Sequence, residues 1–284
     1  MSLSASEQLA HATVRIETNY ADGSVGTGTG FFFNFAGKEP GLRIPTIVTN
    51  KHVVSDAPIG KVHLTFRDND GAPIIGRHLA LQIDNFSPAW VGHPNPEVDL
   101  CVFPINPLLA HLDSQGQRFF YTALDETLIP TDQELTDLMA LEDILMIGYP
   151  NGIWDSVNNM PIFRRGVTAT HPHINYEGRK EFVIDAACFP GSSGSPIFLY
   201  NEGTWSTRQG ATIGGTRIKL LGLLYAGPQH TASGEVRIVN VPTQQRALSF
   251  SSIPNNLGFV IKSERLNEMR TTLLSHIERA EAAA

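Results

Sequence analysis

The sequence predicts an all-β fold, a sandwich or barrel, organised as one unit with two subdomains. Short apolar runs of β type recur from Ala12 to Lys262, and Gly, Pro, Asn and Asp separate them at fairly even intervals. The 284 residues are long for one compact domain and suit two joined subdomains. Hydrophobic residues make up 42% and charged residues 17%, a composition that supports a large core and argues against disorder.

The expected strands are, in chain order, ATVRIET, GTGFFFNF, PTIVTN, KVHLTF, ALQIDNF, DLCVFPI, DILMIGY, GVTATH, EFVIDAA, SPIFLY, LLGLLYAG and LGFVIK. Most of them combine β-branched or aromatic residues and end at turn formers. The long stretch 104–143 is expected to connect the two subdomains, and the stretch 201–218 to form a mobile hairpin loop.

Two stretches interrupt this pattern and predict helices. In residues 131–140, Thr131 can cap a helix and Glu134 follows three residues later, as in a capping box. A second helix is expected from Ser263, where apolar residues recur at spacings of three and four: Leu266, Met269, Leu273 and Ile277. We expect its apolar face to pack on the barrel of the same chain, with docking on a partner protein or a further domain as the alternative.

Charge and composition exclude several classes of protein. The formal net charge of −7 disfavours a nucleic-acid-binding protein, which would carry a basic stripe. No run of about 18 apolar residues is present, so a membrane span is not expected. The N-terminal MSLSASEQLA lacks the basic and apolar regions of a signal peptide, so we expect a cytoplasmic protein.

Cysteine and histidine spacing predicts neither a disulfide framework nor a metal site. Cys101 and Cys188 are expected to be two packed thiols, with a disulfide between them as the alternative. His171 and His173 have a spacing that could suit a metal, but no third ligand lies near them in the sequence. We therefore expect them to be loop or surface histidines, and we expect no cofactor.

The segment FPGSSGSPIF, residues 189–198, places serines and glycines between two strand-like runs. Gly and Ser are ordinary turn residues, but one of the serines could be a nucleophile if a base and a carboxylate support it. His52 follows PTIVTN, Asp99 opens DLCVF, and Ser193 lies in the turn, which gives the order His, Asp, Ser. Asp84 and Asp185 are the alternatives for the carboxylate.

The order of these residues argues against an α/β-hydrolase. That fold runs Ser, Asp, His and has Gly-x-Ser-x-Gly at a strand-to-helix turn. In this chain the last position of that motif is Ser195, a β-type run follows it, and the alternating helices are absent from the sequence pattern. An esterase of that type is therefore only a distant candidate.

Six segments, taken in order, resemble the trypsin-like serine proteases of the chymotrypsin fold, and most closely the bacterial HtrA-like group. The segments are GTGTGFFF with IVTNKHVV, EVDLCVF, LMIGYPNG, RRGVTA, DAACFPGSSGSPIF, and LLGLLYAG with NLGFVIKSE. The resemblance runs from about residue 12 to residue 265 and so covers most of the chain.

This resemblance implies a single peptidase domain over residues 1–284, made of two six-stranded antiparallel β-barrels and a C-terminal α-helix. The expected parts are 12–103 for the N-terminal barrel, 104–143 for a connection with an inserted helix, 144–262 for the C-terminal barrel and 263–284 for the helix. Such an arrangement would place the active site between the two barrels.

The resemblance also assigns roles to the candidate residues. Ser193 would be the nucleophile, His52 the base and Asp99 the residue that orients the base. The backbone N–H groups of Gly191 and Ser193 would form the oxyanion hole, in which each donor is often worth a factor of about 10² to 10³ in rate.

The neighbouring serines are expected to have no chemical role. Ser192 and Ser195 should be turn and packing residues. In trypsin-type zymogens a new N-terminal amine pairs with an acidic residue just before the nucleophile, and here that residue is the uncharged Ser192. We therefore expect an enzyme that needs no proteolytic maturation.

In the fold that the resemblance implies, a primary specificity pocket lies beside the nucleophile. Its expected walls are Ala187, Cys188, Phe189, Leu223, Leu224, Tyr225, Ala226 and Gly227. Ala187, six residues before Ser193, would lie at the base of the pocket and has no carboxylate to pair with Arg or Lys. We expect an aliphatic or small apolar residue before the cleaved bond.

Two classes of function follow from these observations. The first is a serine endopeptidase that hydrolyses extended or unfolded polypeptide. The second is a catalytically weak or inactive module of the same fold that binds or regulates other proteins through its clefts and its C-terminal helix. The intact set of Ser193, His52 and Asp99 favours the first class.

Overall fold

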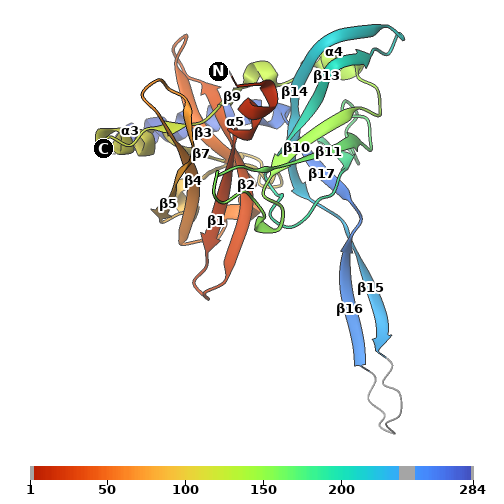
Figure 1. The fold of residues 1–284 in the computed structure, drawn as a ribbon, viewed down its shortest axis with the longest axis horizontal. Coiled ribbons are helices and arrows are strands. Elements are labelled where there is room, and N and C mark those ends of the chain that lie inside the picture. The colour runs from red at the N-terminus through yellow and green to blue at the C-terminus, as the bar shows by residue number, and fades with distance from the viewer. Residues whose placement is uncertain (1–2, 237–246, 283–284) are drawn as a thin grey trace.

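The computed structural model describes residues 3–236 and 247–282 and consists mainly of β-strands (Figure 1). The first sheet has nine strands. They are β1 (Thr13–Asn19), β2 (Val25–Ala36), β3 (Arg43–Thr49), β4 (Ile59–Arg67), β5 (Pro73–Asp84), β6 (Val91–Gly92), β7 (Cys101–Pro104), β8 (Phe119–Phe120) and β9 (Leu124–Asp125). The main path runs β5-β4-β1-β2-β3-β7-β6, with β8 paired to β4 and β9 paired to β2.

The second sheet closes into a barrel in the order β10-β11-β12-β17-β14-β13. Its strands are β10 (Asp143–Gly148), β11 (Ile162–Thr168), β12 (Glu181–Asp185), β13 (Pro196–Ser206), β14 (Thr212–Ala226) and β17 (Leu257–Lys262). Figure 1 shows the two sheets side by side, with the N-terminal strands in red and orange and the second barrel in green to blue.

The all-β prediction is confirmed, and each run expected to be a strand overlaps one. The second barrel has the six strands expected of it, whereas the first sheet has nine. The additional strands of the first sheet are the two-residue elements β6, β8 and β9. Two of these come from the stretch between the main sheets, so the connection also extends the first sheet.

The segment 201–218 forms a hairpin, as the sequence predicted, but most of it is paired strand and not loop. Strands β13 and β14 continue as a paired ladder from Asn201↔Arg217 out to Ser206↔Thr212, and the turn lies between them. Side chains stabilise this outer ladder, because Arg217 donates to Glu142 Oε2 over 2.6 Å and lies over the ring of Trp205. The glycines thus misled the prediction, since cross-strand partners offset their weak preference for strands.

A second hairpin was not expected at all. Strands β15 (Gln229–Val236) and β16 (Ala247–Pro254) pair only with each other and project from the second barrel (Figure 1). They are inserted between β14 and β17, directly after the stretch 223–227. The segment is rich in Ser, Gln and Thr and has no clear apolar alternation, so its sequence indicated no strands.

The helices are short except for the last one. They are α1 (Ala5–Ala10), α2 (Lys51–Val54), α3 (Asn106–Ser114), α4 (Asp132–Asp137) and α5 (Glu264–Ala282), with 3₁₀ turns at Ser87–Ala89, Glu126–Leu128 and Pro150–Gly152. The capping box of Thr131 and Glu134 is present at α4, as predicted. Helix α3 was not predicted. No helix in the described part of the chain is long and apolar enough to cross a membrane.

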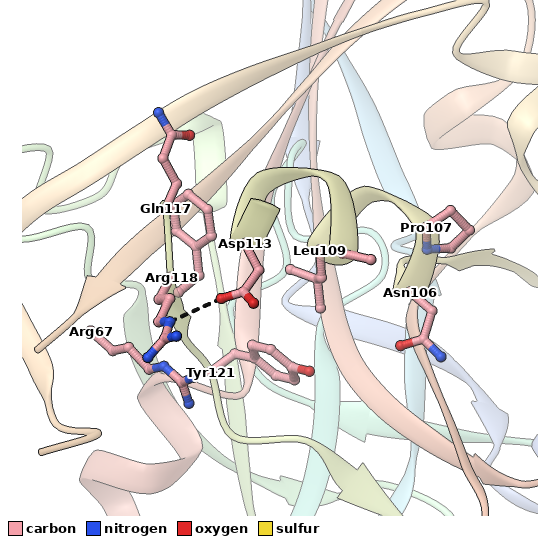
Figure 2. A pocket seen from close by; sticks show the side chains of 10 residues that line it. Arg67, Asn106, Pro107, Leu109, Asp113, Gln117, Arg118 and Tyr121 are labelled. Carbon is pink, nitrogen blue, oxygen red and sulfur yellow. Dashed lines mark hydrogen bonds and ion pairs between the residues drawn. The ribbon is translucent and has the colours of Figure 1, made fainter. Parts of the chain in front are cut away.

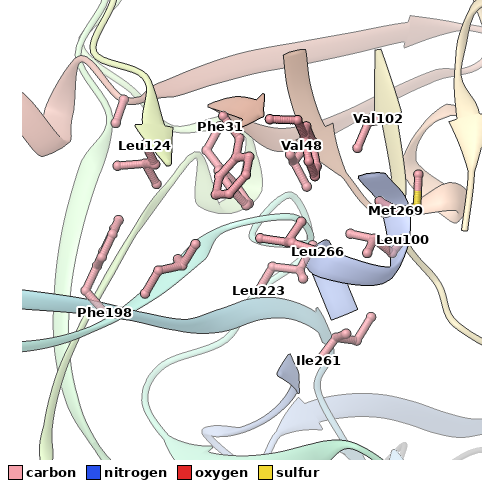
Figure 3. Packing of buried hydrophobic residues seen from close by; sticks show 14 of the residues in the cluster. Phe31, Val48, Leu100, Val102, Leu124, Phe198, Leu223, Ile261, Leu266 and Met269 are labelled. Atoms are coloured by element: carbon pink, nitrogen blue, oxygen red, sulfur yellow. The ribbon is translucent and has the colours of Figure 1, made fainter. Parts of the chain in front are cut away.

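Helix α5 packs its apolar face on the chain's own sheets (Figure 3). Leu266, Met269 and Leu273 are buried in the cluster that includes Phe31 from the first sheet and Leu223 from the second. This is the favoured of the two packings expected from the sequence. A protein partner at α5 stays a prediction, and residues 283–284 of the expected helix lie outside the described residues.

Candidate functional site

His52 and Asp99 are brought together by two neighbouring strands. His52 lies in α2, directly after β3, and Asp99 lies just before β7, which pairs with β3. His52 Nδ1 lies 2.5 Å from Asp99 Oδ2, and the backbone N–H of His52 donates to Asp99 Oδ1 over 3.1 Å. Asn50 Nδ2 donates to the Asp99 carbonyl over 2.7 Å and fixes the same segment. Both carboxylate oxygens of Asp99 therefore face His52.

The environment of Asp99 favours its ionised form. Burial alone would raise the pKa of Asp99, but the hydrogen bonds and the charge of His52 lower the pKa below the ordinary value. An ionised Asp99 favours the His52 tautomer with hydrogen on Nδ1, which leaves Nε2 able to accept a proton. The His52 side chain is 48% exposed, so a substrate could reach it.

The other two aspartates weighed for this role lie elsewhere. Asp84 ends β5, where its carboxylate accepts a hydrogen bond from Gln82. Asp185 ends β12 and pairs with Val167 of β11. Among the described residues, neither carboxylate makes a hydrogen bond or ion pair with His52.

The candidate nucleophile lies in the loop of residues 189–195, which we call the nucleophile loop. Two carbonyls of this loop accept hydrogen bonds from backbone N–H groups. Asn151 N donates to Pro190 O over 2.6 Å, and Ser195 N donates to Ser192 O over 3.0 Å. A trans peptide holds its C=O and N–H on opposite sides. Fixing these carbonyls therefore fixes the direction of the N–H in the same two peptides.

The N–H groups of those two peptides belong to Gly191 and Ser193. They point away from the groups that hold the carbonyls, and within residues 3–236 and 247–282 neither donates a hydrogen bond. Unpaired backbone N–H groups are uncommon in folded proteins. Two of them, two residues apart, form a ready donor pair for an oxygen with negative charge.

The peptides 191–192 and 193–194 are held at both their C=O and N–H ends, so Ser192 N, between the two open donors, is already in use. The four hydrogen bonds are Ser192 N to Phe189 O (3.0 Å), Thr29 Oγ1 to Gly191 O (2.9 Å), Gly194 N to Leu224 O (2.7 Å) and Thr29 N to Ser193 O (2.9 Å).

Glycine is required at two positions of this loop. Gly191 has φ of 85°, and a Cβ there would lie 2.6 Å from Tyr149 O. Gly194 also has φ of 85°, and a Cβ there would overlap the carbonyl of Thr29. Only glycine combines this backbone conformation with so close an approach of another chain segment.

Burial distinguishes the three serines of the loop. Ser192 is 1% exposed and Ser195 is 0% exposed, and both hydroxyls are buried without a partner in the described structure. Ser193 is only half-buried, and its hydroxyl makes no hydrogen bond with the described residues. Ser193 is therefore the one serine of the three whose hydroxyl a substrate could reach.

The expected pocket walls differ among themselves in exposure. Leu223 and Leu224 are 0% and 2% exposed and pack in two separate hydrophobic clusters, so their side chains are not available to line a pocket. The backbone N–H and C=O of Leu224 are both used by the nucleophile loop. Cys188 is also buried.

The other expected wall residues are more accessible. Ala187, Phe189, Tyr225 and Ala226 are half-buried, and Gly227 is exposed. The hydroxyl of Tyr225 donates to Glu181 Oε2 over 2.8 Å. The guanidinium of Arg164 lies 4.9 Å from the ring centre of Phe189, a neighbour that the sequence did not suggest.

The cysteines and the paired histidines do not form a site in the described part of the chain. Cys101 and Cys188 are free, buried thiols, and burial raises the pKa of Cys188 to about 12. His173 lies 3.1 Å from an Asp132 oxygen, while His171 accepts a hydrogen bond from the backbone of His173. No group of three or more metal-ligating side chains lies together in residues 3–236 and 247–282.

The structure adds contacts to the site that the sequence did not indicate. Thr29 of β2 holds two peptides of the nucleophile loop, and Asn151 holds a third. Arg15 of β1 donates to Gly152 O over 2.6 Å and so ties the turn that contains Asn151 to the first sheet. The Thr29 and Arg15 side chains reach partners 162 and 137 residues away in sequence, and nothing in the local pattern relates them.

An open pocket of about 620 Å³ lies elsewhere, between α3 and the strands β4 and β8 (Figure 2). Arg67, Arg118 and Tyr121 are among its lining residues, and Arg118 Nε is held by Asp113 over 2.9 Å. None of the site residues expected from the sequence lines it. This pocket is therefore separate from the candidate site.

Comparison with known proteins identifies a family. The family described as "Trypsin-like peptidase domain" matches residues 28–205, which is more than half of the chain. The match includes His52, Asp99 and Ser193. No curated protein matches the sequence.

Solved structures of proteases also match, at low identity. The active form of the Rv3671c protease from M. tuberculosis is 15% identical, with 91% of this chain and 79% of that chain covered and a TM-score of 0.44. HL collagenase is 13% identical, with 94% of both chains covered and a TM-score of 0.46. The thermostable serine protease AL20 from an extremophilic microorganism is 12% identical, with 92% and 96% covered and a TM-score of 0.42.

Proposed function

Since the chain belongs to the trypsin-like peptidase domain family, we propose that it is a serine endopeptidase that uses Ser193, His52 and Asp99. Its substrate is an extended or locally unfolded polypeptide, because a peptide must lie as a strand along the backbone of Tyr225 to Gly227 to reach Ser193. Of the subgroups of the family, the HtrA-like one is our proposal, and it rests on the sequence segments alone.

The proposed reaction has two halves. Ser193 Oγ attacks the carbonyl carbon of the scissile bond while His52 Nε2 takes the hydroxyl proton, and Asp99 stabilises the imidazolium. The negative oxygen of the tetrahedral intermediate accepts hydrogen bonds from Gly191 N and Ser193 N. The C–N bond then breaks, and the proton passes from His52 to the leaving amine.

The first half leaves an acyl group on Ser193 Oγ. Water attacks this ester with His52 again as the base, through a second tetrahedral intermediate at the same two donors. The acid product leaves, and the proton returns from His52 to Ser193. No cofactor is needed for either half.

One observation carries this proposal. Within the part of the chain that the structure describes, the N–H groups of Gly191 and Ser193 in the nucleophile loop have no partner, and Ser193 is the one serine of the loop that is not buried. Backbone N–H groups in a turn with a purely structural role are usually paired, so two unpaired donors in one turn indicate a binding role. His52 and Asp99 make the hydrogen-bonded pair that an activated serine requires.

We also propose that the enzyme needs no proteolytic maturation. The residue before the nucleophile, Ser192, is uncharged and buried, so it offers no partner to a new N-terminal amine. Thr29 and Asn151 hold the loop instead. The expected preference for an apolar residue before the cleaved bond stands with this proposal, since Ala187 brings no carboxylate to the pocket.

The test is covalent labelling with a fluorophosphonate, which reacts only with an activated serine, followed by intact-mass and peptide mapping. The wild-type chain and Ser195→Ala should each gain one adduct, on Ser193, whereas Ser193→Ala should gain none. Ser193→Ala should also lose about 10⁶-fold in peptidase kcat with unchanged thermal stability. A folded wild-type chain that is neither labelled nor active would support the inactive binding module instead.

A further inference from the structure

Thr29 is the point where the first sheet contacts the nucleophile loop. It lies in β2, opposite Arg15 of β1, and is 0% exposed. Its backbone N–H donates to Ser193 O over 2.9 Å, and its carbonyl accepts from Thr49 Oγ1 over 2.7 Å. Its side-chain hydroxyl donates to Gly191 O over 2.9 Å.

The same hydroxyl has a second partner. Thr29 Oγ1 accepts a hydrogen bond from Tyr149 N over 3.1 Å. Tyr149 immediately precedes the 3₁₀ turn Pro150–Gly152, whose residue Asn151 donates to Pro190 O over 2.6 Å. The Thr29 hydroxyl therefore bonds to the nucleophile loop at Gly191 O and also to Tyr149 N, at the start of the 3₁₀ turn. That turn in its own right bonds to the loop, through Asn151 N to Pro190 O.

We propose that Thr29 is a positioning residue for the oxyanion hole, acting through its hydroxyl on the peptide between Gly191 and Ser192. The proposal rests on the proposed function. The peptide that the hydroxyl holds lies between the two peptides that supply the donors Gly191 N and Ser193 N. Rotation of the held peptide would change the φ of one neighbour and the ψ of the other, and so would turn both donors.

The backbone bond from Thr29 cannot replace the hydroxyl. It ends on Ser193 O, in the peptide that follows the second donor, so without the hydroxyl the peptide of Gly191 O would be held only at its N–H end, by Ser192 N to Phe189 O. Gly191, like Gly194, has more backbone freedom than the other loop residues, since glycine has no Cβ to restrict rotation. Without the hydroxyl, Gly191 O and Tyr149 N would be two buried groups with no partner, and the loop could relieve this by rotating.

Valine and serine at position 29 separate the hydroxyl from the shape of the side chain. Thr29→Val keeps the branched shape and removes the hydroxyl, whereas Thr29→Ser keeps the hydroxyl and removes a methyl group. Thr46→Val is the matched control, because Thr46 is also 0% exposed and its hydroxyl donates to a β2 carbonyl, Phe33 O, over 2.9 Å. That bond lies within the first sheet and has no contact with the loop.

Steady-state kinetics on a peptide substrate, with active sites counted by fluorophosphonate, give the first readout. We expect Thr29→Val to lower kcat per active site by about 10- to 100-fold, with KM changed by less than about 3-fold, because oxyanion donors act in the transition state. Thr29→Ser and Thr46→Val should stay within about 3-fold of the wild type in kcat. A kcat for Thr29→Val within 2-fold of that for Thr46→Val would overturn the proposal.

Amide hydrogen exchange gives a second readout that does not depend on activity. In the Ser193→Ala background, Thr29→Val should speed exchange in the peptide that covers residues 189–195, and Thr46→Val should not. Equal exchange in the two variants would contradict the role of Thr29, even if the wild type proved inactive. If Thr29→Val does not fold, Thr29→Ala serves in both measurements with the same expectations.

Discussion

The nucleophile loop and the His52–Asp99 pair have roles in the same proposed reaction but are held by different means. The loop is fixed peptide by peptide through neutral hydrogen bonds, and its flanking serines, Ser192 and Ser195, are fully buried. The pair depends on hydrogen bonds to one ionised carboxylate, and its imidazole is 48% exposed. The geometry of the loop should therefore resist changes of pH and salt, whereas the pair should respond to both.

Among changes that leave Ser193 in place, the largest effect should come from removing the charge of the pair. Asp99→Asn keeps the shape but removes the carboxylate that selects the His52 tautomer, so kcat should fall by about 10⁴-fold. The loop should be unaffected, because Asp99 makes no contact with it in the described structure. A kcat within 10-fold of the wild type would show that Asp99 does not orient the base.

The same variant has a defined pH signature. The pKa of Asp99 is lowered by His52 in the folded chain, so its stabilising contribution is present above the unfolded value of about 3.9 and is lost as pH falls through the folded value. Urea unfolding should thus show wild type more stable than Asp99→Asn at pH 7, with the difference shrinking toward pH 3. A difference that does not depend on pH would point to packing instead.

Displacing a donor of the nucleophile loop should have the next largest effect on kcat. Gly191→Ala brings a Cβ to 2.6 Å from Tyr149 O, which should displace the Gly191 donor and lower kcat by about 100-fold. Gly41→Ala is a matched control, since Gly41 also has φ of 85° but its Cβ would meet nothing within 4 Å. It should cost only about 1 to 2 kcal/mol of stability, from the left-handed backbone, with normal kcat. Equal loss of kcat in the two variants would show that the close approach of Gly191 to Tyr149 O does not position the Gly191 donor.

A more distant support of the loop should have a smaller effect. Arg15 donates to Gly152 O and stacks on the ring of Trp154, with the guanidinium 5.0 Å from the ring centre. Arg15→Gln should loosen the turn that holds Pro190 O and lower kcat by about 5-fold, the equivalent of one hydrogen bond. Arg118→Gln, which removes an exposed ion pair with Asp113, should leave kcat unchanged. The prediction fails if both variants behave alike.

The smallest expected effect is on stability and comes from His63, a buried histidine whose ring lies next to that of Trp154. Burial lowers the pKa of His63, although Glu17 acts in the opposite direction. The unfolded chain therefore takes up a proton below about pH 6.5 before the folded chain does, and stability should fall as the pH decreases below that value. His63→Gln should flatten the part of this fall that His63 causes, by up to about 1 kcal/mol between pH 7.5 and 5.5 in urea unfolding. An unchanged slope would rule out this contribution.

Some parts of the fold and of the candidate site could be predicted from the sequence, and others could not. His52 follows an apolar run of β type, Asp99 opens another, and Ser193 lies in a turn between two more, so their pattern could be recognised residue by residue. The strands were predictable for the same reason, since each had its own local alternation or apolar content. Helix α4 carried its capping box in four consecutive residues.

Contacts between distant segments could not be predicted in this way. Thr29 reads as one of several small residues in a glycine-rich run, and its role exists only because residue 191 is folded against it. The outer β13–β14 ladder and the β15–β16 hairpin pair polar residues with both polar and apolar ones, as in Ser233↔Phe250, and such mixed pairing gives no clear signal within one strand. Leu223 and Leu224 looked like pocket walls because burial cannot be assigned from sequence order.

In the proposed enzyme, both oxyanion donors, Gly191 N and Ser193 N, are already held in place before substrate binds. The most direct measurement is a pair of crystal structures, one of the free enzyme and one with a phosphonate bound covalently to Ser193 Oγ. We expect a phosphonate oxygen about 2.7–3.1 Å from both nitrogens, with the peptides of residues 189–195 in the same orientation in the two structures. A peptide between Pro190 and Ser193 that is flipped in the free enzyme, or an oxygen bound by neither nitrogen, would contradict this expectation.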